Sequence, residues 1–493
     1  MFKVHKIDIE SGGVLTVGLN KETAKNMNLN VGDRVEVFWD KKSFIAVLEV
    51  SKKAIPIGTI NILRDAWKKF RVPDEVHVKA ISKPRSVDYI KSRLLGNPIT
   101  AEQIREIVSD IMHNRLSAVE STYFVASAYV QRLSFEEEEA LTRAIVDEGE
   151  VLKFEGGPIL DKHCIGGVPG NRTTPIVVPI VAAAGFLMPK TSSKAITSPA
   201  GTADVMEVLS DVSFGNDELV RIVKEVGAVL AWGGSLQLAP VDDMLLKLRY
   251  PLRLDPISFL LASILAKKFA SGAEKVLIDI PLGAKVRSMK AAQDLASRFK
   301  RLGSRLGMEV KVVITEGGQP IGNGIGPALE ARDIVLTLQG KGPKDLREKC
   351  LLLSGTLLEM AGKNDGYSLA KELLDSGAAY KKFKEIIAAQ KGNPDIQAED
   401  IALCPKTHDI LATKDINNIR YSPDVLTKIA RKLGTPSIKG AGIYLHVLPT
   451  RSVNKGGKIM TLYAPDDDRL EAVLEFLKEK TFVLDNKQIL DTT

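Results

Sequence analysis

The first 85 residues alternate between apolar and polar positions, in short runs that glycines separate. Such alternation is the pattern of strands that bury one face, and it occurs in the segments GGVLTVGL, VGDRVEVFW, KSFIAVLEV and EVHVKAI. Short strands joined by glycine turns are typical of a small barrel. The pattern therefore predicts a β-barrel-like domain over residues 1–85, which ends at the Lys-Pro-Arg turn of residues 83–85.

From residue 86 onward the apolar residues recur at the three- and four-residue spacing of a helix. The residues that show this spacing most clearly are Ile104, Ile107, Val108 and Ile111. Capping-box sequences, which mark helix starts, stand at residues 100–103 and 134–137. We predict a helical lobe made of residues 86–150 and 240–272. A core face and a dimer face both explain its apolar stripes.

Strands and helices alternate from residue 151. The segments KVLIDIPLG and MEVKVVIT have the pattern of buried strands, and TTPIVVPIVAAAG that of a buried helix with Pro175 in its first turn. Residues 288–306 have the pattern of an amphipathic helix. Such alternation is typical of a mostly parallel sheet. We assign residues 151–239 and 273–404 to this α/β lobe.

The pattern becomes mixed after residue 405, where AGIYLHVL and GKIMTLYA are predicted strands and residues 468–479 a predicted helix. Residues 405–493 are therefore expected to form a C-terminal α+β domain. Ahead of it, residues 315–327 carry five glycines. We interpret that segment as a loop that packs closely or acts as a hinge.

Composition limits the functions that this chain could have. It has 493 residues, a formal net charge of +7 and 5% aromatic residues. So small a net charge, with few aromatic side chains for stacking, argues against a nucleic-acid partner. No apolar run approaches the roughly 20 residues of a membrane span, and the three cysteines are too scattered for a disulfide framework. We expect a cytoplasmic protein that binds neither nucleic acid nor membrane.

The segment DKHCIGGVPGNRTTP, residues 161–175, combines glycines with cationic and hydroxyl side chains. Its glycines let backbone N–H groups approach an anion closely, and a helix N-terminus just beyond would add its dipole. Lys162 and Thr173 offer a charge and a hydroxyl donor. The segment thus fits a phosphate loop, although it lacks the Walker spacing. A tight strand–helix turn would explain the glycines equally well.

A second loop, KTSSKAITSPAGTAD at residues 190–204, is rich in hydroxyl groups and contains Lys194. Taken alone, it could be a solvated turn or a set of helix caps. Two such loops after successive strands, however, meet at the carboxyl ends of a parallel sheet, where ligands bind. Together they indicate a ligand with more than one anionic group.

The third candidate is the helix of residues 254–272, which Asp255 and Pro256 would begin. Ser263 and Lys267 lie four residues apart and therefore on one face of it. An amine in such an apolar segment needs an anionic or hydrogen-bonding partner. For Asp255 the alternative is an ordinary helix cap.

Three motifs in this order, DKHCIGGVPGNRT, the hydroxyl loop ending in AGTAD, and ASILAKK, resemble the nucleoside phosphorylase family that contains thymidine phosphorylase. The resemblance extends from about residue 86 to the C-terminus, where GIYLHVL and GKIMTLYA are similar to that family's terminal domain. It implies a helical lobe against a larger α/β lobe, with the substrate in the cleft. The periodicity predicts the same two kinds of lobe.

Two departures separate the chain from the pyrimidine-specific members. Cys164 stands where they carry Ser, and Leu248 where they carry Arg. The N-terminal module and the loop around Lys194 instead resemble the AMP phosphorylase branch. That branch implies phosphorolysis of AMP, with CMP or UMP as further substrates, to a base and ribose 1,5-bisphosphate. The partners it implies are AMP and orthophosphate, in a homodimer or larger homo-oligomer, with no metal and no cofactor.

The resemblance also implies roles for individual residues. Orthophosphate would lie near Lys162, Thr173, Ser192 and Thr202. The nucleotide would contact Gly167, Ser193, Lys194, Ala195, Ile196, Thr197, Ser198, Thr202, Ser263 (at the base) and Lys285. Asp255 would be the proton donor to the leaving base, which requires a raised pKa for its carboxyl group.

Three other functions agree with the same residues. A pyrimidine nucleoside phosphorylase acting on thymidine or uridine would catalyse the same class of reaction. An anthranilate-phosphoribosyltransferase-like enzyme would use a pyrophosphate-activated ribose and would need acidic ligands for magnesium, for which Asp161 alone is thin support. A non-enzymatic nucleotide-binding role of the N-terminal barrel is the remaining alternative.

Overall fold

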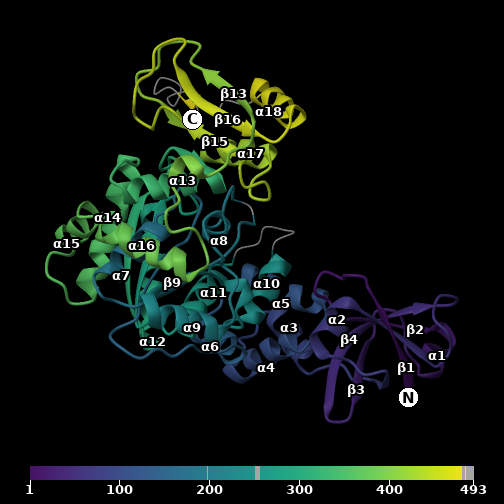
Figure 1. Ribbon diagram of the computed structural model, residues 1–493. Helices are drawn as coiled ribbons and strands as arrows, with labels where there is room; N and C mark the ends of the chain where they lie inside the picture. The colour runs from purple at the N-terminus through teal and green to yellow at the C-terminus, as the bar shows by residue number, and fades with distance from the viewer. Residues whose placement is uncertain (197, 250–255, 480–482, 485–493) are drawn as a thin grey trace. The chain divides into compact units, whose positions relative to one another are not determined.

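The computed structural model describes residues 1–196, 198–249, 256–479 and 483–484 (Figure 1). The chain divides into two compact units, Met1–Glu148 with Pro240–Ser263, and Gly149–Ala239 with Ile264–Thr493. Among the residues that the structure describes, no helix combines the length and the apolar character needed to cross a membrane.

The first unit begins with a closed barrel, drawn in purple in Figure 1. Its elements are β1 (Phe2–Ile7), β2 (Thr16–Asn20), α1 (Lys21–Asn26), β3 (Arg34–Trp39), β4 (Lys42–Ser51), β5 (Thr59–Leu63), α2 (Arg64–Phe70) and β6 (Glu75–Ala80). The strand order is β1-β5-β2-β4-β3-β6, in which β1–β5 and β2–β4 are parallel pairs. Val17, Val37 and Ile60 point into a core where their side chains are fully buried. The predicted barrel is confirmed, and β1 and β5 are strands that were not predicted.

The rest of the first unit is a helical bundle. Its helices are α3 (Ser86–Leu94), α4 (Ala101–Met112), α5 (Ala118–Val130), α6 (Phe135–Asp147), α10 (Pro240–Arg249) and the start of α11 (Ile257–Ala270). Both predicted capping boxes are present, at Thr100 before α4 and at Ser134 before α6. The apolar residues of α4 from Ile104 to Ile111 are at most 2% exposed. Their spacing is therefore that of a core face of the bundle, not of a dimer face.

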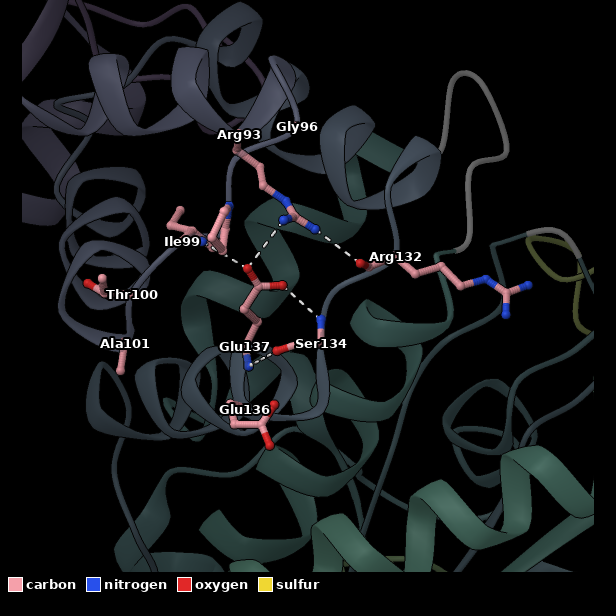
Figure 2. Close-up of a pocket in the computed structure, with 10 residues that line it drawn as sticks. Arg93, Gly96, Ile99, Thr100, Ala101, Arg132, Ser134, Glu136 and Glu137 are labelled. Atoms are coloured by element: carbon pink, nitrogen blue, oxygen red, sulfur yellow. Dashed lines mark hydrogen bonds and ion pairs between the residues drawn. The ribbon is translucent and has the colours of Figure 1, made fainter.

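A cavity of about 440 Å³ lies where α4 and α6 begin (Figure 2). Glu137 reaches across it and accepts from the Ile99 N–H at 2.9 Å and the Ser134 N–H at 2.8 Å. The buried Arg93 guanidinium donates to Glu137 at 3.3 Å and to the carbonyl of Arg132 at 3.0 Å. Arg93 and Glu137 therefore pair with each other, and Glu137 also accepts from N–H groups just before α4 and α6. These contacts join the N-termini of the two helices.

The second unit contains parallel strands, as predicted. They are β7 (Leu160–Cys164), β8 (Met188–Ser192), β9 (Ala228–Trp232), β10 (Lys275–Leu282) and β11 (Glu309–Glu316). The pairs run in the orders β11-β10-β7 and β8-β9, and a parallel bridge between Ile159 and Leu187 connects the two groups. Leu160, Met188 and Leu277 bury their side chains in one core with the surrounding helices.

The helices of this α/β part follow the strands along the chain. They are α7 (Thr174–Ala183), α8 (Thr202–Met206), α9 (Asn216–Val226), α12 (Met289–Arg305), α13 (Pro327–Leu338), α14 (Lys344–Met360), α15 (Gly366–Asp375) and α16 (Ala378–Ala389). Pro175 lies in the first turn of α7 and α12 lies within residues 288–306, as the sequence predicted. The side chain of Ser288 caps α12. The loops after β7 and β8 therefore lead directly into α7 and α8.

The C-terminal part is an antiparallel sheet with helices, which confirms the predicted α+β arrangement. Its elements are β12 (Gly324–Ile325), β13 (Lys406–Leu411), β14 (Arg420–Tyr421), α17 (Pro423–Leu433), β15 (Gly442–Leu445), β16 (Lys458–Ala464), α18 (Asp467–Glu479) and β17 (Val483–Leu484). The main sheet has the order β12-β15-β16-β13. Strand β12 belongs to the glycine-rich segment 315–327, where an added Cβ at Gly324 would lie 2.4 Å from the Leu329 carbonyl oxygen. The interpretation of that segment as closely packed is confirmed.

Candidate functional site

The loop between β7 and α7 has the conformation that its glycines permit. Gly166, Gly167 and Gly170 have φ angles of +86°, +98° and +71°, which other residues rarely adopt. A Cβ at Gly170 would lie 2.1 Å from the Ile321 carbonyl oxygen, and one at Gly167 would lie 3.2 Å from Cγ of Lys285. The loop is thus pressed between two other loops of the same unit. Just beyond it begins α7, whose N-terminal N–H groups favour an anion.

Lys162 and Thr173 stand at the two ends of this loop and contact each other. The Lys162 ammonium donates to Thr173 Oγ1 at 2.6 Å, and the two residues are 1% and 0% exposed. Burial lowers the pKa of Lys162, while the nearby Cys164 and Asp279 act in the opposite direction. The structure therefore brings together the charge and the hydroxyl that the sequence assigned to orthophosphate.

A buried ion pair, between Lys349 and Asp279, lies near Lys162. The Lys349 ammonium is 3.1 Å from Asp279 Oδ2, and Thr315 Oγ1 donates to Asp279 Oδ1 at 2.6 Å. Burial would raise the pKa of Asp279, but Lys162 and Lys349 outweigh it and hold that pKa below its ordinary value. One ionised carboxylate thus faces two ammonium groups, and the excess positive charge suits an anion at the loop.

The hydroxyl loop after β8 folds back onto the start of α8. Asp204 Oδ2 accepts from the N–H groups of Ala195 at 2.6 Å and Gly201 at 2.9 Å. A Cβ at Gly201 would lie 2.5 Å from the Ser193 carbonyl oxygen, so the loop closes tightly on itself. At its start, the Ser192 hydroxyl is buried and has no hydrogen-bond partner among the described atoms. A buried hydroxyl of this kind costs free energy unless it meets a ligand or water.

Arg172 connects the two loops, a role that the sequence did not reveal. Its guanidinium donates to the Ala200 carbonyl at 2.9 Å and to Thr202 Oγ1 at 3.2 Å. Its Nε also pairs with the buried Glu330 carboxylate of α13 at 2.5 Å. The sequence could not show this role, because the partner Glu330 lies 158 residues away. Arg172 therefore sets the spacing between the loops.

A buried triad of Asp161, Lys190 and Lys268 was also missed. Lys268 Nζ is 2.6 Å from Asp161 Oδ2, and Lys190 Nζ is 3.3 Å from Asp161 Oδ1. Burial lowers the pKa of Lys190 to about 7, against the pull of Asp161 and with a further lowering by Lys268. The three side chains join β7, β8 and α11 beneath the two loops. The sequence signal was the lysine pair of ASILAKK. The prediction concerned the first of these lysines, Lys267, whereas the second, Lys268, pairs with Asp161.

Lys194 occupies a different position from the buried lysines. Its ammonium is 2.5 Å from Glu207 Oε1 and 4.4 Å from the centre of the Trp232 ring. Its side chain is 37% exposed. Lys194 is therefore paired on the outer side of the hydroxyl loop, where its flexible side chain can reach a ligand.

The remaining predicted site residues fall in different places. Ser263 belongs to the first unit, where its hydroxyl donates to the buried Asp242 at 2.6 Å. Lys285 is exposed in the turn after β10 that packs against Gly167. Ser198 donates to the Ala200 carbonyl at 3.1 Å, whereas Ile196 is 46% exposed. Asp255 and Thr197 lie outside the described residues.

Comparison with known proteins identifies the family to which this chain is similar. A model of the glycosyl transferase family a/b domain matches residues 156–380, and a model of that family's helical bundle domain matches residues 87–149. The fold also resembles anthranilate phosphoribosyltransferase from Thermus thermophilus, with a TM-score of 0.53 and 21% identity over 62% of this chain and 100% of that chain. At that identity, the likeness concerns the fold alone.

Relatives match along the whole chain. AMP phosphorylase 1 of Archaeoglobus fulgidus is 40% identical over 100% of this chain and 98% of its own length. The AMP phosphorylases of Methanothrix thermoacetophila and Pyrococcus furiosus are 42% and 44% identical, and each covers 96% of this chain and at least 94% of the relative. The resemblance seen in the motifs is confirmed. The chain therefore belongs to the glycosyl transferase family and, within it, to the AMP phosphorylases.

Proposed function

We propose that the chain cleaves AMP with orthophosphate and releases adenine and ribose 1,5-bisphosphate. Full-length relatives that carry the name AMP phosphorylase support the reaction. The observation that carries it in this chain is the pair of anion-suited loops that follow β7 and β8. One has the buried Lys162–Thr173 contact, and on the other the buried Ser192 hydroxyl has no hydrogen-bond partner within the described part of the chain. AMP and orthophosphate together bring two phosphate groups, which suits a pair of anion-binding loops.

The chemistry explains why these groups are needed. The bond between the base nitrogen and C1′ of ribose breaks, an orthophosphate oxygen forms the new bond to C1′, and a proton passes to the base. Positive charge develops on the ribose and negative charge on the base. A phosphate held by Lys162 and Thr173 stabilises the first, and a protonated carboxyl group stabilises the second. We assign that proton to Asp255.

The other site residues take part in binding in this proposal. Orthophosphate is held by Lys162, Thr173 and Ser192. The nucleotide is held by Gly167, Ser193, Lys194, Ala195, Ile196, Thr197, Ser198, Thr202, Ser263 and Lys285. The 5′-phosphate lies at the hydroxyl loop beside Lys194, and the base lies at Ser263. CMP and UMP are further substrates of the same site.

Cys164 supports the nucleotide branch rather than pyrimidine nucleosides. It replaces a hydroxyl of the pyrimidine-specific relatives, and its Sγ accepts from the Gly166 N–H at 3.4 Å and from Asn171 Nδ2 at 3.3 Å. Burial raises the pKa of the Cys164 thiol, so it stays protonated and holds the loop.

A homo-oligomer belongs to the same proposal. Val119, Tyr123 and Val130 on α5 are at least 53% exposed and support it.

Phosphate-dependent base release tests the proposal. AMP, adenosine, CMP, UMP and thymidine are incubated side by side with and without orthophosphate, and free base is quantified. We expect adenine from AMP when phosphate is present, with far slower release from adenosine and thymidine. Base released from the nucleosides but not from the nucleotides would overturn the proposal. Release without phosphate would indicate hydrolysis instead.

A further inference from the structure

AMP differs from adenosine by one phosphate group, so a residue that favours AMP must contact that group. Lys194 is the cation of the hydroxyl loop in the proposed function, and this inference rests on that function. We propose that Lys439, from the C-terminal part of the chain, is the second cation of the 5′-phosphate subsite. Lys439 would then be a specificity-determining residue.

The two lysines meet at one carboxylate. Glu207 Oε1 is 2.5 Å from the Lys194 ammonium, and Glu207 Oε2 is 2.8 Å from that of Lys439. Burial acts to raise the pKa of Glu207, but the two lysines outweigh it and hold that pKa below its ordinary value. Two ammonium groups from separate parts of the chain therefore meet at one ionised carboxylate beside the hydroxyl loop.

Lys439 also lies against the hydroxyl loop itself. Its Nζ is 3.4 Å from Asp204 Oδ1, and the other oxygen of that carboxylate accepts from the N–H of Ala195 within the loop. A second cation of the same region, Arg431, donates to the Ser198 carbonyl at 3.4 Å. The C-terminal part thus contacts the hydroxyl loop at two residues, Ser198 and Asp204.

The backbone of Lys439 is fixed while its side chain remains partly exposed. Its carbonyl accepts from the Ala328 N–H at 3.0 Å, and the next carbonyl, of Gly440, accepts from the Cys404 N–H at 2.9 Å. The side chain is 36% exposed, close to the 37% of Lys194. Because the backbone of Lys439 is already fixed, little conformational entropy is lost when its ammonium group moves from a carboxylate to a phosphate.

A phosphate monoester is a better partner for two ammonium groups than Glu207. It carries about −1.5 to −2 charges and three acceptor oxygens, whereas the carboxylate carries one charge. Lys194 and Lys439 can each donate to a separate phosphate oxygen, and charge-assisted hydrogen bonds of this kind are the strong ones. Without the nucleotide, Glu207 holds the two ammonium groups at the subsite. In the complex, both ammonium groups bind the 5′-phosphate.

The test compares AMP with adenosine in variants of Lys439. Lys439→Gln removes the charge at nearly constant length, and Lys439→Arg keeps it. Lys458→Gln is the matched control, because Lys458 is an exposed lysine of the same C-terminal part that pairs with Asp409 at 2.5 Å, away from the loop. The quantity measured is kcat/KM for AMP divided by kcat/KM for adenosine, which does not depend on the fraction of folded enzyme.

We expect Lys439→Gln to lower this ratio by about 10-fold, mainly through KM for AMP, as the loss of one charge-assisted contact to phosphate implies. Lys439→Arg should restore most of the ratio, and Lys458→Gln should leave it unchanged. An unchanged ratio in Lys439→Gln would overturn the inference, as would an equal fall for the control. A parent enzyme that releases no adenine from AMP contradicts the proposed function instead. In that case, calorimetry of AMP binding to the parent and to Lys439→Gln still tests the role of Lys439.

Discussion

In the proposed function, the protonation state of Lys162 bears most directly on phosphate binding. Its burial lowers the pKa of the ammonium below that of an ordinary lysine. In the free enzyme the charge is therefore present at low pH and is lost as the pH rises through this lowered pKa. A bound phosphate dianion favours the charged form, so the same loss occurs at higher pH in the complex.

This reasoning predicts the alkaline side of the pH profile. With orthophosphate as the varied substrate, kcat/KM should fall at a pH below the ordinary pKa of lysine, about 10.4, and kcat should fall at higher pH than kcat/KM. Lys162→Arg should move the fall in kcat/KM to higher pH, because a guanidinium stays protonated. Lys190→Arg is the control, since Lys190 is also a buried lysine with a lowered pKa but is assigned no phosphate contact. A fall that stays in place in Lys162→Arg would contradict the role of Lys162.

Asp255 carries the second prediction at this scale. Asp255→Asn keeps the shape and hydrogen-bonding capacity of the side chain but removes its acidic proton. We expect kcat for AMP to drop about 10² to 10⁴-fold, the usual effect of losing a general acid, while AMP binding by calorimetry changes little. If kcat stays within about threefold of the parent, Asp255 caps a helix and the proton comes from another group.

At the scale of elements, the alternation of strands and helices was predictable because each element carries its own period. Strands β10 and β11 and helices α7 and α12 were predicted within a few residues, since their apolar residues are contiguous or regularly spaced. Strand β1 was missed because its alternation breaks at the consecutive polar residues His5 and Lys6, and none of its side chains is buried. Strand β5 alternates strictly, with Ile60 and Ile62 buried, so its pattern could have predicted it.

The loop between β7 and α7 allows a prediction that compares two of its glycines. Gly166 and Gly170 both have positive φ, so alanine at either position carries the same kind of backbone strain. A Cβ at Gly166 meets nothing within 4 Å, whereas one at Gly170 lies 2.1 Å and 2.9 Å from the carbonyl oxygens of Ile321 and Gly324. We expect Gly170→Ala to unfold roughly 1–5 °C below Gly166→Ala in a thermal scan, because overpacking adds about 1–3 kcal/mol. Equal midpoints would show that the loop after β11 yields easily.

At the scale of the whole molecule, the contacts of the candidate site were predictable where they are local in sequence, and not where they join distant parts of the chain. Lys162 and Thr173 lie 11 residues apart, at the two ends of one loop, so their contact follows from a strand–turn–helix pattern. Lys268 pairs with Asp161 across 107 residues, and Lys439 with Glu207 across 232. No periodicity relates residues so far apart, because their contact depends on how the chain folds as a whole.

The division of the chain affects the order in which its parts can fold during synthesis. The barrel needs no residue beyond Ala80 for its strands, so it can close as soon as it leaves the ribosome. The bundle must wait for α10 and α11, because Phe124 of α5 packs against Phe259 at 5.7 Å and Glu138 accepts from Ser258 at 2.7 Å. Between residues 148 and 263 the ribosome needs roughly 6 to 23 s at 5–20 residues per second. During that interval Phe124, which is fully buried in the finished protein, faces water on a half-built bundle and is open to chaperones.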